Sequence, residues 1–218
     1  MSRRRVVVTG LGVISPVGNT VTEAWSNLIA GKSGIGPITR FDASNFAARI
    51  AGEVKDFDVS AYLSPKEARR MDVFIHYGMA AGIQAIRDSG IEVTEANADR
   101  IGINIGSGIG GLPMIEDTHN DFLGGGPRKI SPFFIPGTII NMISGNLSIM
   151  FGMKGPNLAV VTACTTGLHA IGMGARMIGY GDADVMVCGG AESTVTNLAI
   201  GGFGSAKASN EEAYLFQE

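Results

Sequence analysis

The pattern of apolar and polar positions predicts one long amphipathic helix in the first half of the chain. Ser64 is a helix cap, Pro65 takes the first helical position, and Glu67 completes a capping box. Apolar or small residues then recur with a period of about 3.6 residues, at Met71, Phe74, Ile75, Gly78, Met79, Gly82 and Ile86. The stripe predicts a single helix from Ser64 to about Gly90, with one face buried.

Short apolar runs between the helical segments predict strands. These runs are 5–9, 100–105, 158–161 and 184–188, and the last two are typical of buried strands. Further helices are predicted between Thr20 and Gly31, over 136–151, and from 165 to about 178, whereas 32–63 is expected to be loop-rich. Because strands and helices alternate, the predicted fold class is α/β, with layered helices and a largely buried sheet.

The chain is poor in charge. Charged residues make up 17% of its 218 residues, below the usual share of about 25%, while apolar residues make up 45%. This composition excludes a globally disordered chain. Between Lys129 and Arg176 the one charged residue is Lys154, and the helix predicted over 165–178 is apolar or small almost all round. Such a helix is expected in the centre of a protein.

Net charge, cysteine content and hydropathy narrow the class of protein further. A formal net charge of −3 gives no basic field for nucleic acid, and two cysteines suit a reducing compartment. The charged start at residues 1–5 lacks the apolar run of a signal peptide. Residues 130–153 are uncharged but too rich in Pro, Gly, Asn and Ser for a lipid-facing helix. We therefore expect a soluble, cytoplasmic protein with neither a membrane nor a nucleic acid as partner.

Cys164 is the first candidate for chemistry. It lies in a predicted strand-to-helix turn, where the helix dipole and free N–H groups favour the reactive thiolate. Thr162, Thr165 and Thr166 keep this turn polar. The alternative is that Cys164 is a small buried hydrophobe, as free cysteines often are. Cys188, in the middle of a predicted strand, is interpreted in that second way.

The sequence offers no clear partner for a reactive thiol. A thiolate nucleophile normally works with a base or an acid, and the histidines of the chain are His76, His119 and His169. His169 follows Cys164 at about 140° round a helix and so is expected to point elsewhere. His76 lies in the long helix and His119 in a predicted surface segment. No complete Cys–His pair is predicted, and no group has the spacing of metal ligands.

A glycine-rich loop follows the strand predicted over 100–105. Gly106, Gly108 and Gly111 have the spacing of a dinucleotide-binding loop. The acidic residue expected about 20 positions further on is absent. The alternative is a backbone turn against which another element packs closely, and no cofactor is expected.

Cations gather near the start of the long predicted helix. Lys66, Arg69 and Arg70 lie in its first two turns, where each cation is unfavourable by about 0.3–1 kcal/mol at low salt. They form either a solvated face or a docking surface for an acidic partner. Such a docking surface would also include Arg128, Lys129 and Lys207.

Several segments together resemble the bacterial β-ketoacyl-acyl-carrier-protein synthases, and within them the type II condensing enzymes of fatty acid elongation. The segments are 6–12 with 15–18, 126–132, 162–167 and 201–204. The resemblance covers residues 1–207 and implies the N-terminal half of a duplicated, thiolase-like layered fold with a mixed sheet. Residues 208–218 leave the family pattern and are interpreted as a divergent tail.

The resemblance implies roles for particular residues. Cys164 would take the acyl chain from acyl-carrier protein, and its own backbone N–H would be one oxyanion donor. Ile109 and Phe203 would gate and line the acyl pocket, and Phe134 would reach into the pocket of the neighbouring subunit of a homodimer. The basic surface that grips the carrier protein would be Lys66, Arg69, Arg70, Arg128, Lys129 and Lys207.

Three function classes follow from these features. The first is an acyltransferase that loads Cys164, decarboxylates malonyl-carrier protein and lengthens the chain by two carbons. The family's two catalytic histidines and its second oxyanion donor match nothing in this chain, so the isolated polypeptide is expected not to condense. The second class is a non-catalytic fragment that keeps the carrier-protein docking and dimer surfaces. The third, a dinucleotide-dependent oxidoreductase, rests on residues 106–111 alone.

Overall fold

The structure is a computed structural model that describes residues 4–208. Its contacts divide the chain into two units. The sheet unit holds residues up to 14 together with 58–193, and the hairpin unit holds residues 15–57 together with those from 194 onward. All but the first residue of the predicted divergent tail, 208–218, lie outside the described residues.

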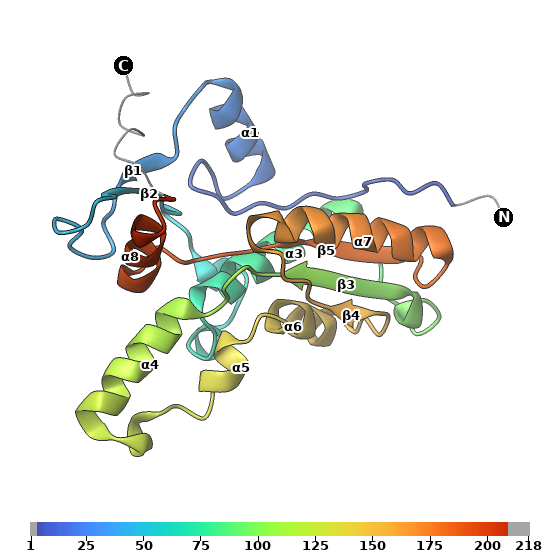
Figure 1. The fold of residues 1–218 in the computed structure, drawn as a ribbon. Coiled ribbons are helices and arrows are strands. Elements are labelled where there is room, and N and C mark those ends of the chain that lie inside the picture. The colour runs from blue at the N-terminus through green and yellow to red at the C-terminus, as the bar shows by residue number, and fades with distance from the viewer. Residues whose placement is uncertain (1–3, 209–218) are drawn as a thin grey trace. The chain divides into compact units, whose positions relative to one another are not determined.

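A parallel three-stranded sheet forms the centre of the sheet unit (Figure 1). The central strand is β3 (Ile101–Gly106), and its neighbours are β4 (Asn157–Leu158) and β5 (Val185–Gly190). β3 pairs with β5 along its whole length and with β4 only at Ile103 and Asn104. Because both pairings are parallel, the carboxyl ends of the strands meet at one edge of the sheet.

Helices cover both faces of β3. Ile101, Ile103 and Ile105 belong to the core that the strand shares with α3 (Val73–Ser89) and α6 (Met142–Phe151). On the opposite face, the Nδ2 of Asn104 donates a hydrogen bond of 3.3 Å to the backbone oxygen of Ala170 in α7 (Thr166–Tyr180). Alternate side chains of a strand point to opposite faces, so one strand anchors both helical layers (Figure 1).

Small residues of α3 allow α6 to pack closely against it. A Cβ placed at Gly78 would lie 2.5 Å from the Ile143 side chain, and one placed at Gly82 would lie 2.5 Å from Leu147. Ile143 and Leu147 are both fully buried. The predicted apolar stripe, with its glycines, is therefore the face that packs against α6.

The single helix predicted from Ser64 to Gly90 is wrong, because the structure has α2 (Pro65–Ala68) followed by α3. The capping box at Ser64 and the left-handed Gly90 are as predicted. The break occurs at Asp72, whose backbone N–H donates to the carbonyl of Gly137. Its carboxylate accepts hydrogen bonds from the N–H groups of Phe74 (3.2 Å) and Met114 (2.8 Å). The bonds to Gly137 and Met114 replace continued helix, and burial raises the pKa of Asp72.

The helix predicted over 136–151 is also two helices, α5 (Phe134–Thr138) and α6. The carbonyl of Thr138 accepts a hydrogen bond of 3.1 Å from Gly111, in the loop after β3. Ile139 then adopts an extended conformation. A carbonyl that is bonded to another segment no longer supports the helical ladder, so the helix restarts at Met142.

The strand predicted over 5–9 is wrong, since within residues 4–208 no backbone pairs with it. The segment that follows packs on α3 instead. The N–H groups of Leu11 and Val13 donate to the side chains of Asp88 and Gln84. A Cβ at Gly12 would lie 1.9 Å from the carbonyl oxygen of Ala81, so only glycine permits this close approach.

Two other strand predictions need correction. The run 158–161, predicted as a buried strand, contributes only Leu158 to β4, and both residues of β4 are exposed at the edge of the sheet. The run 184–188 does form a strand, β5, but its residues are half-buried rather than buried. By contrast, the strand predicted over 100–105 is present as β3, and it is buried at every position.

The hairpin unit contains α1 (Val21–Ile29), β1 (Ile35–Pro37), β2 (Ile50–Gly52) and α8 (Asn197–Ser205). Thr20 caps α1 by accepting the N–H of Glu23, and Gly31 ends it with φ of 68°, as predicted. β1 and β2 form an antiparallel pair inside the stretch predicted to be loop-rich. Three-residue strands with a glycine in each give too weak a pattern for sequence analysis to detect.

Apolar side chains remain exposed on one side of α7. Ala170 and Gly174 are buried, but Leu168 is 74% exposed and Ile171 is 52% exposed. The sequence places a helix of this composition in the centre of a protein, and the described residues cover it on the sheet side only.

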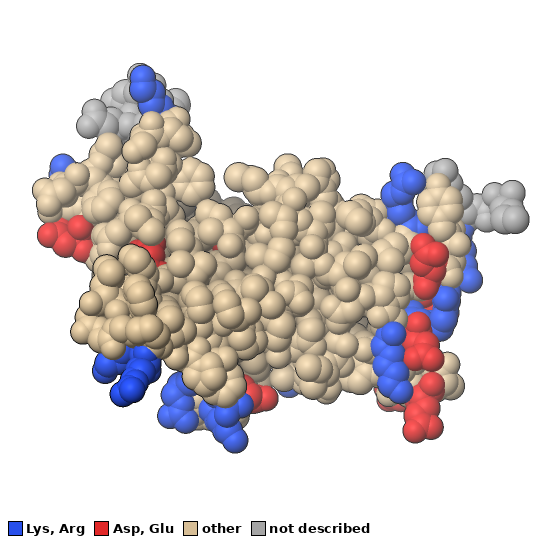
Figure 2. All heavy atoms as spheres, turned by 60° about the horizontal axis from the view of Figure 1, so that its bottom comes forward, with Lys and Arg blue, Asp and Glu red and all other residues tan. Residues whose placement is uncertain are grey.

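The side of the molecule on which α5 and α6 lie is also poor in charge. Figure 2 turns this side toward the viewer, and its middle shows no charged side chain, in keeping with the uncharged stretch 130–153. Ile149 of α6 is 81% exposed. None of the helices within residues 4–208 is long and apolar enough to cross a membrane.

Candidate active site

Cys164 lies in a short 3₁₀ turn, η4 (Ala163–Thr165), immediately before α7. Its side chain is exposed. The expected strand-to-helix position at the N-terminus of α7 is therefore confirmed. The dipole of a 15-residue helix favours negative charge at this end.

Threonines hold the turn in shape. The N–H of Thr162 donates to the hydroxyl of Thr166 (2.9 Å), and the hydroxyl of Thr165 donates to the carbonyl of Thr162 (2.7 Å). Ala163, directly before the cysteine, has φ of 52°, a left-handed conformation that is unfavourable for a residue with a side chain. Strain of this kind persists only where the surroundings impose it, and it is typical of functional sites.

The turn packs against the carboxyl end of β3. A Cβ at Gly106 would lie 1.9 Å from the carbonyl oxygen of Val160 and 2.8 Å from the side chain of Thr166. Only glycine therefore allows the start of α7 to approach the end of the strand. This edge of a parallel sheet is where α/β proteins place their ligands.

Cys188 lies in a different environment. It is in the middle of β5, and a Cβ placed at Gly174 of α7 would lie 2.2 Å from its sulfur. Burial raises the pKa of the Cys188 thiol to about 11. The prediction that Cys188 is a packing residue is consistent with these contacts.

Limiting iodoacetamide at pH 7 is expected to modify Cys164 at least ten times faster than Cys188. A thiol with a pKa of about 11 is thiolate in only about one molecule in 10⁴ at pH 7, and the thiolate is the reactive form. Peptide mass mapping of the native chain measures both sites, with the Cys188→Ala variant as control. Preferential labelling of Cys188 would overturn the assignment.

None of the three histidines forms a bonded pair with Cys164 in the structure. The Nδ1 of His169 lies 2.8 Å from the hydroxyl of Thr162, so His169 contacts the cysteine turn at Thr162. The Nε2 of His76 lies 2.8 Å from the carbonyl oxygen of Ala68, at the break between α2 and α3. His119 lies in α4 (Leu112–Gly125). The absence of a complete Cys–His pair stays a prediction.

The loop after β3 lies beside the cysteine turn. The Cβ position of Gly108 is 3.5 Å from the Cα of Ala163. Ile109 is next in this loop, and its side chain is 44% exposed. Its backbone N–H donates to the carboxylate of Glu192 (2.9 Å), so an amide that a dinucleotide phosphate would need is already bonded within the chain. Sequence analysis missed Glu192, although an acidic residue just after a strand that ends in two glycines was a detectable signal.

For Phe134 and Phe203, the other residues predicted to line an acyl pocket, the described part of the structure gives no contact with the cysteine turn. Phe134 is half-buried at the start of α5 in the sheet unit. Phe203 lies in α8 of the hairpin unit, so its position relative to Cys164 is not defined.

Five of the six predicted docking cations lie in the sheet unit. Lys66, Arg69, Arg128 and Lys129 are exposed. The guanidinium of Arg70 lies 4.1 Å from the centre of the Phe133 ring, just beyond the 3₁₀ turn Pro127–Lys129. This contact joins the two stretches of sequence that carry the cations. The sixth cation, Lys207, lies in the hairpin unit.

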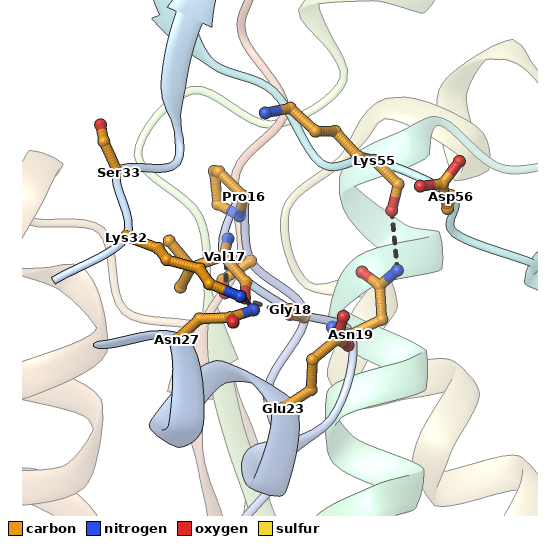
Figure 3. Close-up of a pocket in the computed structure, with 11 residues that line it drawn as sticks. Pro16, Val17, Gly18, Asn19, Glu23, Asn27, Lys32, Ser33, Lys55 and Asp56 are labelled. Atoms are coloured by element: carbon orange, nitrogen blue, oxygen red, sulfur yellow. Dashed lines mark hydrogen bonds between the residues drawn. The ribbon is translucent and has the colours of Figure 1, made fainter. Parts of the chain in front are cut away.

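The hairpin unit contains an open cavity of about 210 Å³ (Figure 3). It is lined in part by residues 15–18, a segment that carries the resemblance described above. The Nδ2 of Asn27 donates to the carbonyl of Val17 (2.6 Å), and that of Asn19 donates to the carbonyl of Lys55 (2.7 Å). The cavity has two lysines and two carboxylates on its wall, so its formal charges balance. We interpret these bonds as bracing for the loops of this unit.

No group of three or more His, Cys, Asp or Glu within residues 4–208 is arranged to hold a metal ion. Cys164 is thus the one site in the sheet unit that joins an exposed nucleophile, a helix N-terminus and a strained turn at the carboxyl edge of the sheet.

Comparison with known proteins gives consistent matches along the chain. The family model described as "Beta-ketoacyl synthase, N-terminal domain" matches residues 3–215. The chain is 63% identical to 3-oxoacyl-[acyl-carrier-protein] synthase 2 of Vibrio harveyi, over 95% of this chain and 50% of that protein. It is 58% identical to the enzyme of the same name from Coxiella burnetii, again over 95% of this chain and 50% of that protein. The chain therefore spans about half the length of these curated relatives.

Solved structures give the same picture. The ishigamide ketosynthase/chain length factor superposes with a TM-score of 0.84 at 31% identity, covering 96% of this chain and 52% of that one. A type II PKS ketosynthase, solved in complex with its acyl-carrier protein, superposes with a TM-score of 0.77 at 28% identity. That match covers 94% of this chain and 55% of the other.

Proposed function

The chain belongs to the β-ketoacyl synthase family as its N-terminal domain, and from this premise we propose that Cys164 is the nucleophile of a condensing enzyme. One observation carries the proposal: Cys164 is exposed in a strained, threonine-braced turn at the N-terminus of α7. This environment favours a thiolate, and a thiolate is the nucleophile that acyl transfer from a thioester requires.

The proposed first step is a thioester exchange. The Cys164 thiolate attacks the thioester carbonyl carbon of the acyl group that the carrier protein holds. A bond forms between the Cys164 sulfur and that carbon. The backbone N–H of Cys164 donates to the oxyanion that develops. The carbon–sulfur bond to the carrier then breaks, and the carrier leaves as a thiolate that takes up the proton lost when the Cys164 thiol ionised. The products are acyl-Cys164 and free carrier thiol.

The proposed second step is the condensation that gives the family its name. Malonyl-carrier protein loses carbon dioxide, and the resulting enolate carbon attacks the acyl-Cys164 carbonyl. Cys164 leaves as the thiolate, and the carrier holds a β-ketoacyl chain longer by two carbons. Residues 1–207 are proposed to form the half of the enzyme that holds the nucleophile, followed by a divergent tail, and the setting is proposed to be the cytoplasm.

The proposed assembly is a homodimer in which Phe134 reaches into the acyl pocket of the neighbouring subunit. Ile109 and Phe203 are proposed to gate and line the pocket of their own subunit. The exposed apolar side chains on α6 support this proposal, because a neighbouring subunit would cover them.

The experiment that tests the proposal follows the free thiol that acyl-carrier protein releases when mixed with the chain. The native chain and the Cys188→Ala variant are expected to release about one thiol per chain. Cys164→Ala is expected to release none. Equal release by Cys164→Ala and the native chain would remove the proposed nucleophile.

The exposed cations are proposed to dock the acidic carrier protein. Charge reversal at Arg69 and Arg70 is expected to slow association by about tenfold or more at low salt, with a smaller change in dissociation. Binding of the native chain is expected to weaken as salt rises, because exposed charges are screened beyond about 10 Å at 0.1 M. Surface plasmon resonance at several salt concentrations measures both rates.

The matched control for charge reversal is Lys154→Glu, at an exposed lysine outside these cations. It changes the net charge in the same direction and is expected to leave association within about twofold of native. The comparison is with Arg69→Glu alone, which changes the net charge by the same amount, and an equal loss in the two variants would assign the effect to net charge and discard the docking surface.

A further inference from the structure

Glu192 ties down the loop that carries Ile109. It lies just beyond β5, and each of its two carboxylate oxygens accepts one hydrogen bond from the loop after β3. Oε1 accepts from the hydroxyl of Ser107 (3.1 Å), and Oε2 accepts from the backbone N–H of Ile109 (2.9 Å). One side chain therefore holds the loop at two points from the neighbouring strand.

A third bond closes the loop on itself. The hydroxyl oxygen of Ser107 accepts the N–H of Gly110 (3.0 Å), and Ser107 is 1% exposed. The backbone on both sides of Ile109 is therefore fixed. The Ile109 side chain, 44% exposed, is the part of this loop that remains free to rotate.

The tied loop touches the nucleophile's turn. The Cβ position of Gly108 lies 3.0 Å from Oε2 of Glu192 and 3.5 Å from both Cα and O of Ala163. Ala163 precedes Cys164, and Gly108 precedes Ile109. Gly108 therefore lies between the carboxylate of Glu192 and the cysteine turn, and a side chain at this position would press on Glu192.

We propose that Glu192 is a positioning residue that sets which acyl-chain lengths reach Cys164, by fixing the backbone of Ile109 in the loop next to the cysteine turn. The inference rests on the proposed function, in which Cys164 accepts acyl chains past Ile109. With the backbone held, a long chain enters only when the Ile109 side chain rotates. Without the carboxylate, the loop itself can move and discrimination between short and long chains is lost.

The test uses thiol reagents of two lengths and needs no acyl transfer. The Cys164 thiolate attacks methyl or octyl methanethiosulfonate at the thiol-derived sulfur, forming a mixed disulfide and releasing methanesulfinate. Rates are measured by intact mass on the full 218-residue chain carrying Cys188→Ala. The ratio of the octyl rate to the methyl rate reports access for a long chain.

Glu192→Ala is expected to raise this ratio by about tenfold, the size expected when hydrogen bonds to a charged group are lost. Glu192→Gln is expected to keep the native ratio within about twofold, since its oxygen can accept from Ile109 and its NH₂ can donate to Ser107. The matched control is Glu95→Ala, an exposed carboxylate that no described residue bonds. It is expected to leave the ratio unchanged.

A double-mutant cycle identifies Ile109 as the route of the effect. In an Ile109→Ala background, Glu192→Ala is expected to change the ratio by less than about twofold. A native ratio in Glu192→Ala, or a full effect that persists without the Ile109 side chain, overturns the proposal. If Glu192→Ala does not fold, as judged by circular dichroism, Ser107→Ala replaces it under the same criteria, because it removes one of the two ties to Glu192 together with the bond from Gly110.

The outcome is separable from that of the proposed function. If Glu192→Ala changes the reagent ratio but the native chain takes no acyl group from carrier protein, the role of Glu192 stands and the acyltransferase proposal fails. If Cys164 is acylated but the native chain and Glu192→Ala give equal reagent ratios, the acyltransferase proposal stands and the proposed role of Glu192 fails.

Discussion

Ile143→Ala is expected to lower the free energy of unfolding by about 2–5 kcal/mol. Ile143 is 0% exposed, and its side chain fills the space above Gly78 where α6 crosses α3. Removing the side chain leaves a cavity between two helices that both pack on β3, and the tight contact at Gly82 and Leu147 limits collapse. Urea unfolding followed by circular dichroism measures the change.

The matched control lies on the same helix. Ile149→Ala makes the same chemical change at a side chain that is 81% exposed. It is expected to change the free energy of unfolding by less than about 0.5 kcal/mol. Equal losses for Ile143→Ala and Ile149→Ala would contradict the packing of α6 on α3.

The 218-residue polypeptide is expected to acylate Cys164 but not to complete a condensation. Decarboxylation leaves an enolate on a thioester, and its charge must be stabilised as it develops. The resemblance implies that two imidazoles do this, and His76, His119 and His169 are expected to match neither of them. In the structure, His76 and His169 bond to Ala68 and Thr162 instead.

Loss of two such donors is expected to lower the rate by about 10⁴–10⁶, because each oxyanion donor is worth about 10²–10³. Acyl transfer needs less, namely a thiolate at a helix N-terminus and one amide donor. The assay supplies acyl- and malonyl-carrier protein and measures released carbon dioxide and β-ketoacyl product. Turnover at about 1 s⁻¹ or faster would show that catalytic groups within this chain have been overlooked. A chain that binds carrier protein but takes no acyl group would be the non-catalytic fragment of the second function class.

Local signals in the sequence predicted the parts of the fold that depend on neighbouring residues. The capping box at Ser64, the stop at Gly90 and the turn at Cys164 need only a few adjacent positions, and all are present. The α/β, thiolase-like fold expected from the resemblance is confirmed by the likeness to solved ketosynthases.

The features that sequence analysis missed depend on partners far along the chain. The helix break at Asp72 exists because Met114 and Gly137 bond to it, and no periodicity records such contacts. The two hydrogen bonds that Glu192 accepts come from Ser107 and Ile109, which precede it by 85 and 83 positions. The run 5–9 has strand propensity, but propensity alone provides no pairing partner among the described residues.

The central claim is that Cys164 accepts the acyl group, and mapping the acylated peptide tests it most directly. The native chain is incubated with acyl-carrier protein, digested at low pH to preserve the thioester, and examined by mass spectrometry. We expect one acyl group per chain, on the peptide that contains Cys164, and none on the peptide that contains Cys188. An acyl group on Cys188, or an unmodified Cys164 after complete reaction, would contradict the account.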